Sequence, residues 1–252
     1  MGFVAAVAGK GGVGKTTISA LLLRAFLRAG AGPVLMIDAD PNSNLNEAVG
    51  VPPQKTLGDL MERTMARKDD LPGGMSKTEF IQYGIEECLH EGNGFDLLAM
   101  GRPEGPGCYC AANNTLRRHL EILSGNYPVV VIDNEAGMEH LSRRTTAKID
   151  LLLLVSEPSP VGIMTAARIR DLAREMEITV ARTGLVINRV SGPSIAARLV
   201  EEARRHGLEV LGTVPMDDAV VEQAMAHLPA FRLPDGAPAV KAIEVVLAGV
   251  AV

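Results

Sequence analysis

A glycine-rich segment near the N-terminus has the residue types and the spacing of a phosphate-binding loop. It follows a short apolar run and opens an amphipathic stretch that is typical of a helix, which is the context such a loop requires. Glycines allow the backbone to turn its N–H groups toward phosphate oxygens, and the helix N-terminus adds a favourable dipole. We therefore predict a nucleotide site whose phosphate contacts are Gly9, Lys10, Gly11, Gly12, Val13, Gly14, Lys15, Thr16 and Thr17.

Side chains in this segment supply what a bound phosphate group needs. Lys15 provides a positive charge, the Thr16 hydroxyl is placed to ligate Mg²⁺, and Thr17 can reach another phosphate oxygen. Lys10 is a second lysine, which cannot easily serve the phosphates that Lys15 already holds. We therefore expect Lys10 to face another subunit, with a solvated loop lysine as the alternative.

Three aspartates follow apolar runs that are predicted to be strands. Asp38 and Asp40 close the run Val34–Ile37, and Asp133 closes the run Val129–Ile132. Ligands of open parallel sheets bind beyond the carboxyl ends of the strands, so we expect these carboxylates to project toward the phosphates and Mg²⁺. A capping or turn role accounts for any one of them, but it accounts poorly for three at matching positions.

Recognition of the base has a weaker signal, at the ends of two later apolar runs. Asn188 ends one run, and its side-chain amide carries both a donor and an acceptor that could pair with the edge of adenine. Pro215 follows the last run and is assigned to the same part of the site. A turn residue at the end of a strand is the alternative for Asn188.

Cys108 and Cys110 form a second group of residues able to do chemistry. They lie in a loop rich in glycine and proline, and in extended backbone both sulfurs point to one side, where one soft metal ion could bind them. Zn²⁺ takes four ligands and Ni²⁺ often takes a square plane, so two thiolates per chain indicate a site completed by a second subunit. Structural or redox cysteines are the alternative, and Cys88 is predicted to be a small core residue.

The elements that must position these residues are predicted from apolar runs that alternate with helical stretches. This alternation predicts an α/β fold with one mostly parallel, twisted sheet of about seven strands and helices on both faces. The predicted strands are Phe3–Ala8, Val34–Ile37, Phe95–Ala99, Val129–Ile132, Leu151–Val155, Leu185–Ile187 and Val210–Thr213. The predicted helices are Lys15–Ala29, Thr78–His90, Asn114–Leu123, Val161–Met176 and Pro193–His206, with a short helix between Gly50 and Gly74 and a packing helix in Lys241–Val252.

Length and composition narrow the class of protein. The chain has 252 residues, of which 47% are hydrophobic, and a formal net charge of −5. We expect a single domain over residues 1–252, because a chain of this length can bury a core without disulfides or a structural metal. The acidic balance argues against a nucleic acid or an anionic membrane as partner. No run approaches the roughly 18 apolar residues of a membrane span and no secretory signal is present, so we expect a cytoplasmic protein.

The glycine-rich segment also resembles the phosphate loop of a known group of proteins. Residues 9–17 read Gly-Lys-Gly-Gly-Val-Gly-Lys-Thr-Thr and are similar to the deviant loop of dimeric ATPases, which include septum-site and partition ATPases, the nitrogenase iron protein and metal-insertion ATPases. Together with residues 101–110 and 134–143, the loop resembles the CooC-type nickel-insertion ATPases that mature carbon monoxide dehydrogenase. The resemblance covers nearly the whole chain in order and spacing, and the Cys-x-Cys loop is its most discriminating part.

For the nucleotide site, this resemblance implies an ATPase that binds ATP and dimerises with MgATP. It implies that Lys10 reaches across the dimer interface to stabilise charge on the partner's nucleotide, as an arginine finger does. It also implies that Asp40 orients or deprotonates the attacking water and that Asp38 supports Mg²⁺. Asp133 and Gly137 would form a switch segment of the pattern Asp-x-x-x-Gly.

For the thiol pair, the resemblance implies a metal site shared by the two subunits. Cys108 and Cys110 of each chain would bind Ni²⁺, with Zn²⁺ able to occupy the same site. The client would be carbon monoxide dehydrogenase or a related nickel enzyme, and ATP hydrolysis would release the metal near it.

Two other functions of the same group stay open as alternatives. A reductase like the nitrogenase iron protein would need a cysteine after the second switch, and residues 133–142 contain none. A septum- or partition-type switch would bind membrane or DNA through basic segments, and residues 241–252 hold one lysine and one glutamate.

Overall fold

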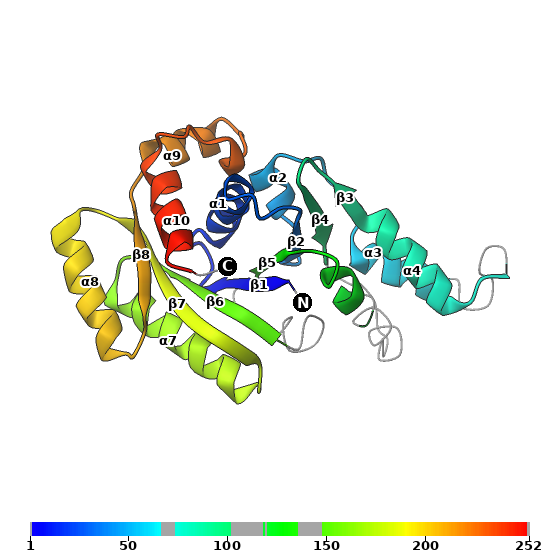
Figure 1. Cartoon of the computed structure of the whole chain (residues 1–252), viewed down its shortest axis with the longest axis horizontal. Coiled ribbons are helices and arrows are strands. Elements are labelled where there is room, and N and C mark those ends of the chain that lie inside the picture. Colours follow the sequence, from blue (N-terminus) through cyan, green and yellow to red (C-terminus); the bar gives the residue numbers. More distant parts are fainter. Residues whose placement is uncertain (1, 67–73, 102–117, 119, 136–147, 251–252) are drawn as a thin grey trace.

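An eight-stranded sheet forms the centre of the computed structural model, which describes residues 2–66, 74–101, 118, 120–135 and 148–250 (Figure 1). The strand order is β3-β4-β2-β5-β1-β6-β7-β8. Within these residues neighbouring strands are parallel, except that β3 runs antiparallel to β4. The strands are β1 Phe3–Gly9, β2 Val34–Ala39, β3 Leu89–Glu91, β4 Phe95–Ala99, β5 Val129–Asn134, β6 Lys148–Ser156, β7 Thr179–Val190 and β8 Val210–Pro215.

The predicted α/β fold with a mostly parallel sheet is confirmed, and each of the seven predicted runs lies within a strand. The prediction is wrong at the end of one helix, because α4 ends at Cys88, and Leu89 and His90 belong to β3 rather than to the predicted helix Thr78–His90. Leu89 pairs with Leu98 of β4. This pairing across the sheet outweighs the local helical pattern, and a short window of sequence does not reveal it.

Helices cover both faces of the sheet, as predicted. One face carries α1 (Lys15–Arg28), α2 (Leu45–Val49), α9 (Asp218–Met225) and α10 (Pro238–Ala248). The opposite face carries α3 (Leu57–Ala66), α4 (Lys77–Cys88), α7 (Pro160–Glu175) and α8 (Pro193–Arg205). Within the described residues, no helix combines the length and the hydropathy that crossing a bilayer would require.

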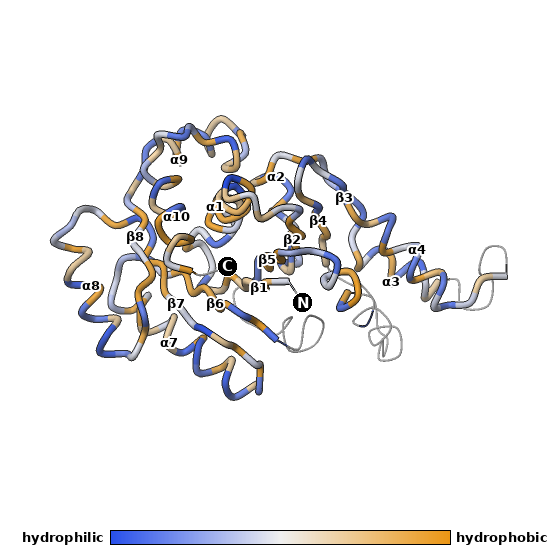
Figure 2. The backbone as a smooth tube through the Cα atoms, in the orientation of Figure 1, coloured by the Kyte–Doolittle hydropathy of each residue, from blue (hydrophilic) through white to orange (hydrophobic). Residues whose placement is uncertain are grey.

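Apolar side chains on the two faces of the strands explain this layering. Neighbours such as Met36 and Ile37, or Val131 and Ile132, point to opposite faces and join two separate apolar clusters. The strands are therefore buried on both sides, which is why the sequence shows continuous apolar runs. Figure 2 shows the complementary pattern on the outside, where hydrophobic and hydrophilic residues alternate along α7 and α8.

Local sequence signals account for several helix boundaries. The Ser76 hydroxyl accepts a hydrogen bond from the Glu79 backbone N–H, and the Glu79 carboxylate accepts one from the Ser76 N–H, so these two residues form a capping box at the start of α4. The predicted short helix between Gly50 and Gly74 is α3, and the predicted C-terminal packing helix is α10. Most of the predicted helix Asn114–Leu123 lies outside the described residues, and residues 118 and 120–124 are helical.

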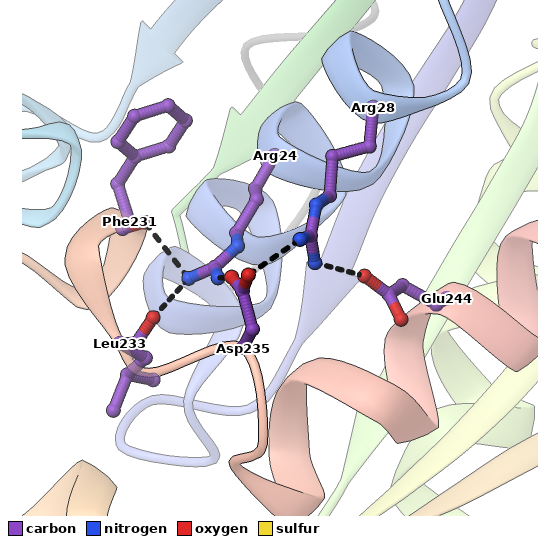
Figure 3. A network of polar contacts seen from close by, with 6 residues as sticks. All are labelled: Arg24, Arg28, Phe231, Leu233, Asp235 and Glu244. Atoms are coloured by element: carbon purple, nitrogen blue, oxygen red, sulfur yellow. Dashed lines mark hydrogen bonds and ion pairs between the residues drawn. The ribbon is translucent and has the colours of Figure 1, made fainter.

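A polar network joins α1 to the segment between α9 and α10 (Figure 3). Arg24 of α1 is 9% exposed and donates to the backbone carbonyls of Phe231 and Leu233 and to the carboxylate of Asp235. Arg28, one turn further along α1, pairs with Asp235 at 2.7 Å and with Glu244 of α10 at 2.8 Å, but it is far more exposed. Arg24 is therefore the buried member that fixes the C-terminal segment to α1.

We predict that Arg24→Met lowers the free energy of unfolding by about 2 kcal/mol, because two buried carbonyls and a carboxylate lose a charged donor. Arg28→Met is the matched control on the same helix and should have a much smaller effect, because its ion pairs are solvated. Urea denaturation of the two variants and the wild type measures the difference. Equal losses of unfolding free energy in both variants would show that the buried contacts of Arg24 stabilise the fold no more than the exposed ion pairs of Arg28 do.

Candidate nucleotide-binding site

The predicted phosphate loop connects β1 to α1 and turns where its glycines require it to. Gly14 has a φ of 95°, and a Cβ atom there would lie 2.5 Å from the Asn188 side-chain nitrogen. A Cβ atom on Gly9, at the end of β1, would lie 2.3 Å from the Val155 carbonyl oxygen of β6. Gly9 and Gly14 are therefore steric requirements of this turn.

Lys15 begins α1 and bends back over the loop. Its ammonium group donates to the Lys10 carbonyl oxygen at 3.2 Å, and the residue is only 8% exposed. Burial lowers the pKa of Lys15, while the nearby carboxylates of Asp133, Asp40 and Glu135 oppose that shift. The site thus holds a partly desolvated cation beside carboxylates at the start of a helix, where an anion is favoured.

Asp133 ends β5 directly opposite Asp38 of β2 and is almost fully buried. Its carboxylate accepts a hydrogen bond from the Ser19 hydroxyl of α1 at 3.0 Å, and the Thr16 hydroxyl at the start of α1 lies near it. Burial raises the pKa of Asp133 to about 6, against the lowering effect of these hydroxyls and of Lys15. The structure therefore brings Asp133, Thr16 and Lys15 together, as the sequence predicted.

Asp38 is placed at the same edge but is engaged with its own loop. One carboxylate oxygen accepts from the Asp40 N–H at 3.0 Å, and the other accepts from the Leu45 N–H at 2.9 Å. The residue is 1% exposed, and burial raises the pKa of Asp38 to about 7. Asp38 thus fixes the turn that carries Asp40. This structural role adds to the role predicted from the sequence, which is to support Mg²⁺.

Asp40 lies one residue beyond β2, half-buried at the predicted phosphate edge. One of its carboxylate oxygens accepts from the backbone N–H and the side-chain amide of Asn42, at 2.9 and 3.0 Å. These contacts hold the carboxylate in a turn close enough to Lys15 to oppose the lowered pKa of the lysine. The contacts with Asn42 therefore orient the Asp40 side chain.

Lys10 is the exposed lysine of the loop. Its ammonium group lies 3.9 Å from the Glu157 carboxylate after β6, and both side chains are about half exposed. A solvated pair of this kind contributes little to stability. Lys10 is thus free to exchange Glu157 for another anion.

A pocket of about 600 Å³ opens beside the loop, between α1 and the segment that joins β8 to α9. Asn188 and Pro215, the two predicted base-site residues, both line it, together with Gly14, Thr17 and Met216. Apolar side chains make up much of the wall, including Leu21, Val214, Val220, Val221 and Met225. A flat, mostly apolar purine fits such a wall, next to a loop that would hold its phosphates.

Sequence reasoning missed three residues that complete this site. Ser19 donates to Asp133, and its place one helical turn from Lys15 and Thr16 could have signalled it. Asp217 caps α9 through the Ala219 N–H and also accepts from the Ala239 N–H at the start of α10. Arg189 donates to the Gly12 carbonyl oxygen at 3.2 Å, and no local signal predicts that contact.

The predicted metal ligands Cys108 and Cys110 lie outside the described residues, and so does Gly137 of the predicted switch segment. Cys88 is buried, as predicted, and its thiol donates to the Thr56 carbonyl oxygen at 3.4 Å. In the part of the chain that the structure describes, no three His, Cys, Asp or Glu side chains gather as a metal site.

The geometry defines a P-loop nucleoside triphosphatase, with a glycine loop between a strand and a helix, a lysine at the helix start and carboxylates on neighbouring strands. Residues 4–230 match the model of the CobQ/CobB/MinD/ParA nucleotide-binding domain. The chain belongs to this family and is an ATPase.

Relatives span nearly its whole length. An uncharacterized ATP-binding protein of Methanocaldococcus jannaschii is 40% identical over 96% of this chain and 95% of its own. The carbon monoxide dehydrogenase accessory protein CooC of Rhodospirillum rubrum is 35% identical over 90% of this chain and 89% of its own.

Solved structures show the same fold. The ParA family ATPase of Chlorobium tepidum has a TM-score of 0.71 at 19% identity, over 100% of both chains. The cell division ATPase MinD of Pyrococcus furiosus also has a TM-score of 0.71, at 20% identity, over 99% of this chain and 98% of its own.

We predict that Asp133 makes the protein without nucleotide or Mg²⁺ less stable as the pH rises. The pKa of Asp133 is raised from its usual 3.8 to about 6 on folding, so the folded state holds this proton more tightly than the unfolded state does. The stabilisation is complete below the unfolded pKa and is lost as the pH rises through the folded one. Between about pH 5 and pH 8 this group should lower the free energy of unfolding by on the order of 1 kcal/mol.

Urea denaturation across that range, on the wild type and on Asp133→Asn, checks this prediction. The variant keeps the shape of the side chain but removes the carboxylate of Asp133 and its repulsion of Asp38, so its pH profile should be flatter than that of the wild type. Parallel profiles for the two proteins would contradict the assignment.

Proposed function

We propose that the chain is an ATP-hydrolysing metallochaperone that closes as a homodimer with MgATP and delivers Ni²⁺ to carbon monoxide dehydrogenase or a related nickel enzyme. The observation that carries the metal-delivery part is the 35% identity to the accessory protein CooC, over 90% of this chain, together with the Cys108 and Cys110 pair. The nucleotide part is supported by the loop and by the buried groups around it.

In the proposed reaction, the loop and Lys15 bind the phosphates of ATP, and Asp40 orients the water that attacks the terminal phosphorus. The residues present fit Mg²⁺, because the Thr16 hydroxyl and the Asp38 and Asp133 carboxylates offer hard oxygen ligands at one edge of the sheet. Bound Mg²⁺ would neutralise charge on the phosphate oxygens. Both oxygens of Asp38 already accept backbone N–H bonds, so Asp38 would support the ion mainly by fixing the turn before Asp40.

Lys10 is proposed to act on the nucleotide bound by the partner subunit. Lys15 already occupies the loop on its own side, and among the residues that the structure describes Lys10 forms an exposed pair with Glu157. A lysine that leaves such a weak pair can stabilise charge that develops on a phosphate supplied from across an interface.

Mixing two inactive variants tests this action between subunits. Lys10→Ala and Asp40→Ala should each lose most of the ATPase activity, and an equal mixture should recover about a quarter of the wild-type rate. Random pairing makes half of the dimers mixed, and each mixed dimer holds one intact site. Phosphate release after subunit exchange measures the rate.

A mixture of Lys15→Ala and Lys10→Ala is the matched control and should behave in the same way, because Lys15 acts within its own chain. Lys10 would be assigned to its own subunit's nucleotide if neither mixture recovered activity although both exchanged subunits.

For the metal site, we propose that the thiolates of Cys108 and Cys110 from two subunits make a four-sulfur site. Four thiolates suit the tetrahedral preference of Zn²⁺ and the square-planar preference of Ni²⁺. Cys88 is a poor additional ligand, because burial raises the pKa of its thiol to about 11 and keeps it protonated.

Anaerobic size-exclusion chromatography with in-line metal detection tests the nickel part. With Ni²⁺ and a non-hydrolysable MgATP analogue, wild type should elute as a dimer carrying about one nickel ion, and the double variant Cys108→Ser/Cys110→Ser should carry none. Cys88→Ser is the matched control and should keep its nickel, because it removes a thiol that lies in the core.

Two outcomes would redirect the proposal. A dimer that forms with nucleotide but carries no metal would indicate a septum- or partition-type switch. Bound iron and sulfide would indicate an electron carrier like the nitrogenase iron protein.

A further inference from the structure

A serine lies on the face of α1 that packs against the sheet. Ser19 is completely buried, and its neighbours Leu22 and Leu23 belong to the apolar core. A hydroxyl in such a place costs free energy unless a partner accepts its hydrogen. A serine inside a helix can donate to the backbone carbonyl four residues earlier, but the Ser19 hydroxyl donates its one hydrogen to the Asp133 carboxylate, at 3.0 Å. The contact therefore joins two distant parts of the chain.

The backbone of Asp133 is held from both sides of β5. Asp133 pairs with Val7 of β1 on one side and with Asp38 of β2 on the other. The sheet thus fixes where the side chain begins, and the side-chain torsions decide where its two oxygens lie. The last torsion of an aspartate has a broad range. A hydrogen bond to one oxygen restricts that range, and Ser19 supplies such a bond.

The position of Ser19 on α1 relates this bond to the predicted magnesium site. Ser19 lies three residues after Thr16, so the two hydroxyls share one face of the helix, and both lie near the Asp133 carboxylate. Thr16 is the residue that we predict to ligate Mg²⁺. This ion demands a near-ideal octahedral arrangement of its ligands and waters. A carboxylate that turned freely beside Thr16 would therefore serve the ion less well than one that is held.

We propose that Ser19 is a positioning residue for Mg²⁺, which holds the Asp133 carboxylate in the orientation that the ion, or a water bound to the ion, requires. In this role Ser19 touches neither the ion nor the nucleotide. The inference rests on the proposed MgATP site, and it is independent of metal delivery.

Ser156 offers a matched control. It ends β6 at the same edge of the sheet and is also almost completely buried, but its hydroxyl has no hydrogen-bond partner in the described part of the chain. A change from serine to alanine removes the same atom at both positions. Only Ser19→Ala, however, removes a hydrogen bond to a carboxylate.

The test separates binding of Mg²⁺ from binding of the nucleotide. A fluorescent, non-hydrolysable ATP analogue is bound first in EDTA and then over a titration with Mg²⁺. We expect Ser19→Ala to match wild type in EDTA and to need about ten times more Mg²⁺ for half of the full effect. Ser19→Thr keeps the hydroxyl and should stay within about threefold of wild type. Ser156→Ala should need the same amount of Mg²⁺ as wild type.

A second comparison asks whether Ser19 acts through Asp133. Ser19→Ala is made again in the Asp133→Asn background, where the carboxylate is absent. Residues that act as one unit are not additive, so the loss of Ser19 should change the Mg²⁺ requirement there by less than about twofold. An undiminished tenfold effect in that background would overturn the proposal.

Other results also count against Ser19. Equal weakening of the analogue in EDTA and in Mg²⁺ would show that Ser19 supports the phosphate loop as a whole, and a Mg²⁺ titration of Ser19→Ala equal to that of wild type would remove its role altogether. Failure of the magnesium site itself looks different, because binding to wild type would then not respond to Mg²⁺. In that case the proposed MgATP site falls, and the inference falls with it.

Discussion

The phosphate loop must keep its backbone N–H groups unpaired, and much of the surrounding structure follows from this constraint. Because these N–H groups must stay available to the phosphates, the loop cannot be stabilised by the usual hydrogen bonds within its own backbone. Its carbonyl groups are held instead by side chains from outside, with Lys15 on Lys10, Arg189 on Gly12 and Asn188 on Val13. The protein's own side chains thus hold the shape of the anion site.

Charged side chains around the loop are also held in place by the fold. Burial raises the pKa values of Asp38 and Asp133 and lowers that of Lys15, so the fold holds these charged groups against their preference for water. A bound cation with a polyphosphate would supply counter-charges to both kinds of group at once. The electrostatics of the site therefore suit a metal-bound nucleotide.

The sequence was sufficient for features that depend on local pattern, and insufficient for those that depend on contacts between distant residues. Continuous apolar runs marked every parallel strand, and glycine spacing marked the loop, because both reflect the chain's own geometry. Strand β3 was not predicted, because its strand conformation depends on pairing with β4. The contact of Asn188 with Val13 and the double role of Asp217 in α9 and α10 were missed for the same reason.

The chain also offers a physical link between the nucleotide site and the segment that leads to the cysteine pair. Beyond β4, the Met100 N–H donates to the Asp38 carbonyl oxygen at 2.8 Å, and the Met100 carbonyl accepts from the Gly58 N–H at 2.9 Å. The Asp38 side chain meanwhile fixes the turn that carries Asp40. A ligand that displaces this turn would therefore also displace Asp38, and through the Asp38 carbonyl it would move Met100. Cys108 and Cys110 follow Met100 closely in the sequence, so the coupling proposed between hydrolysis and the thiols has a starting point in the contact between Asp38 and Met100.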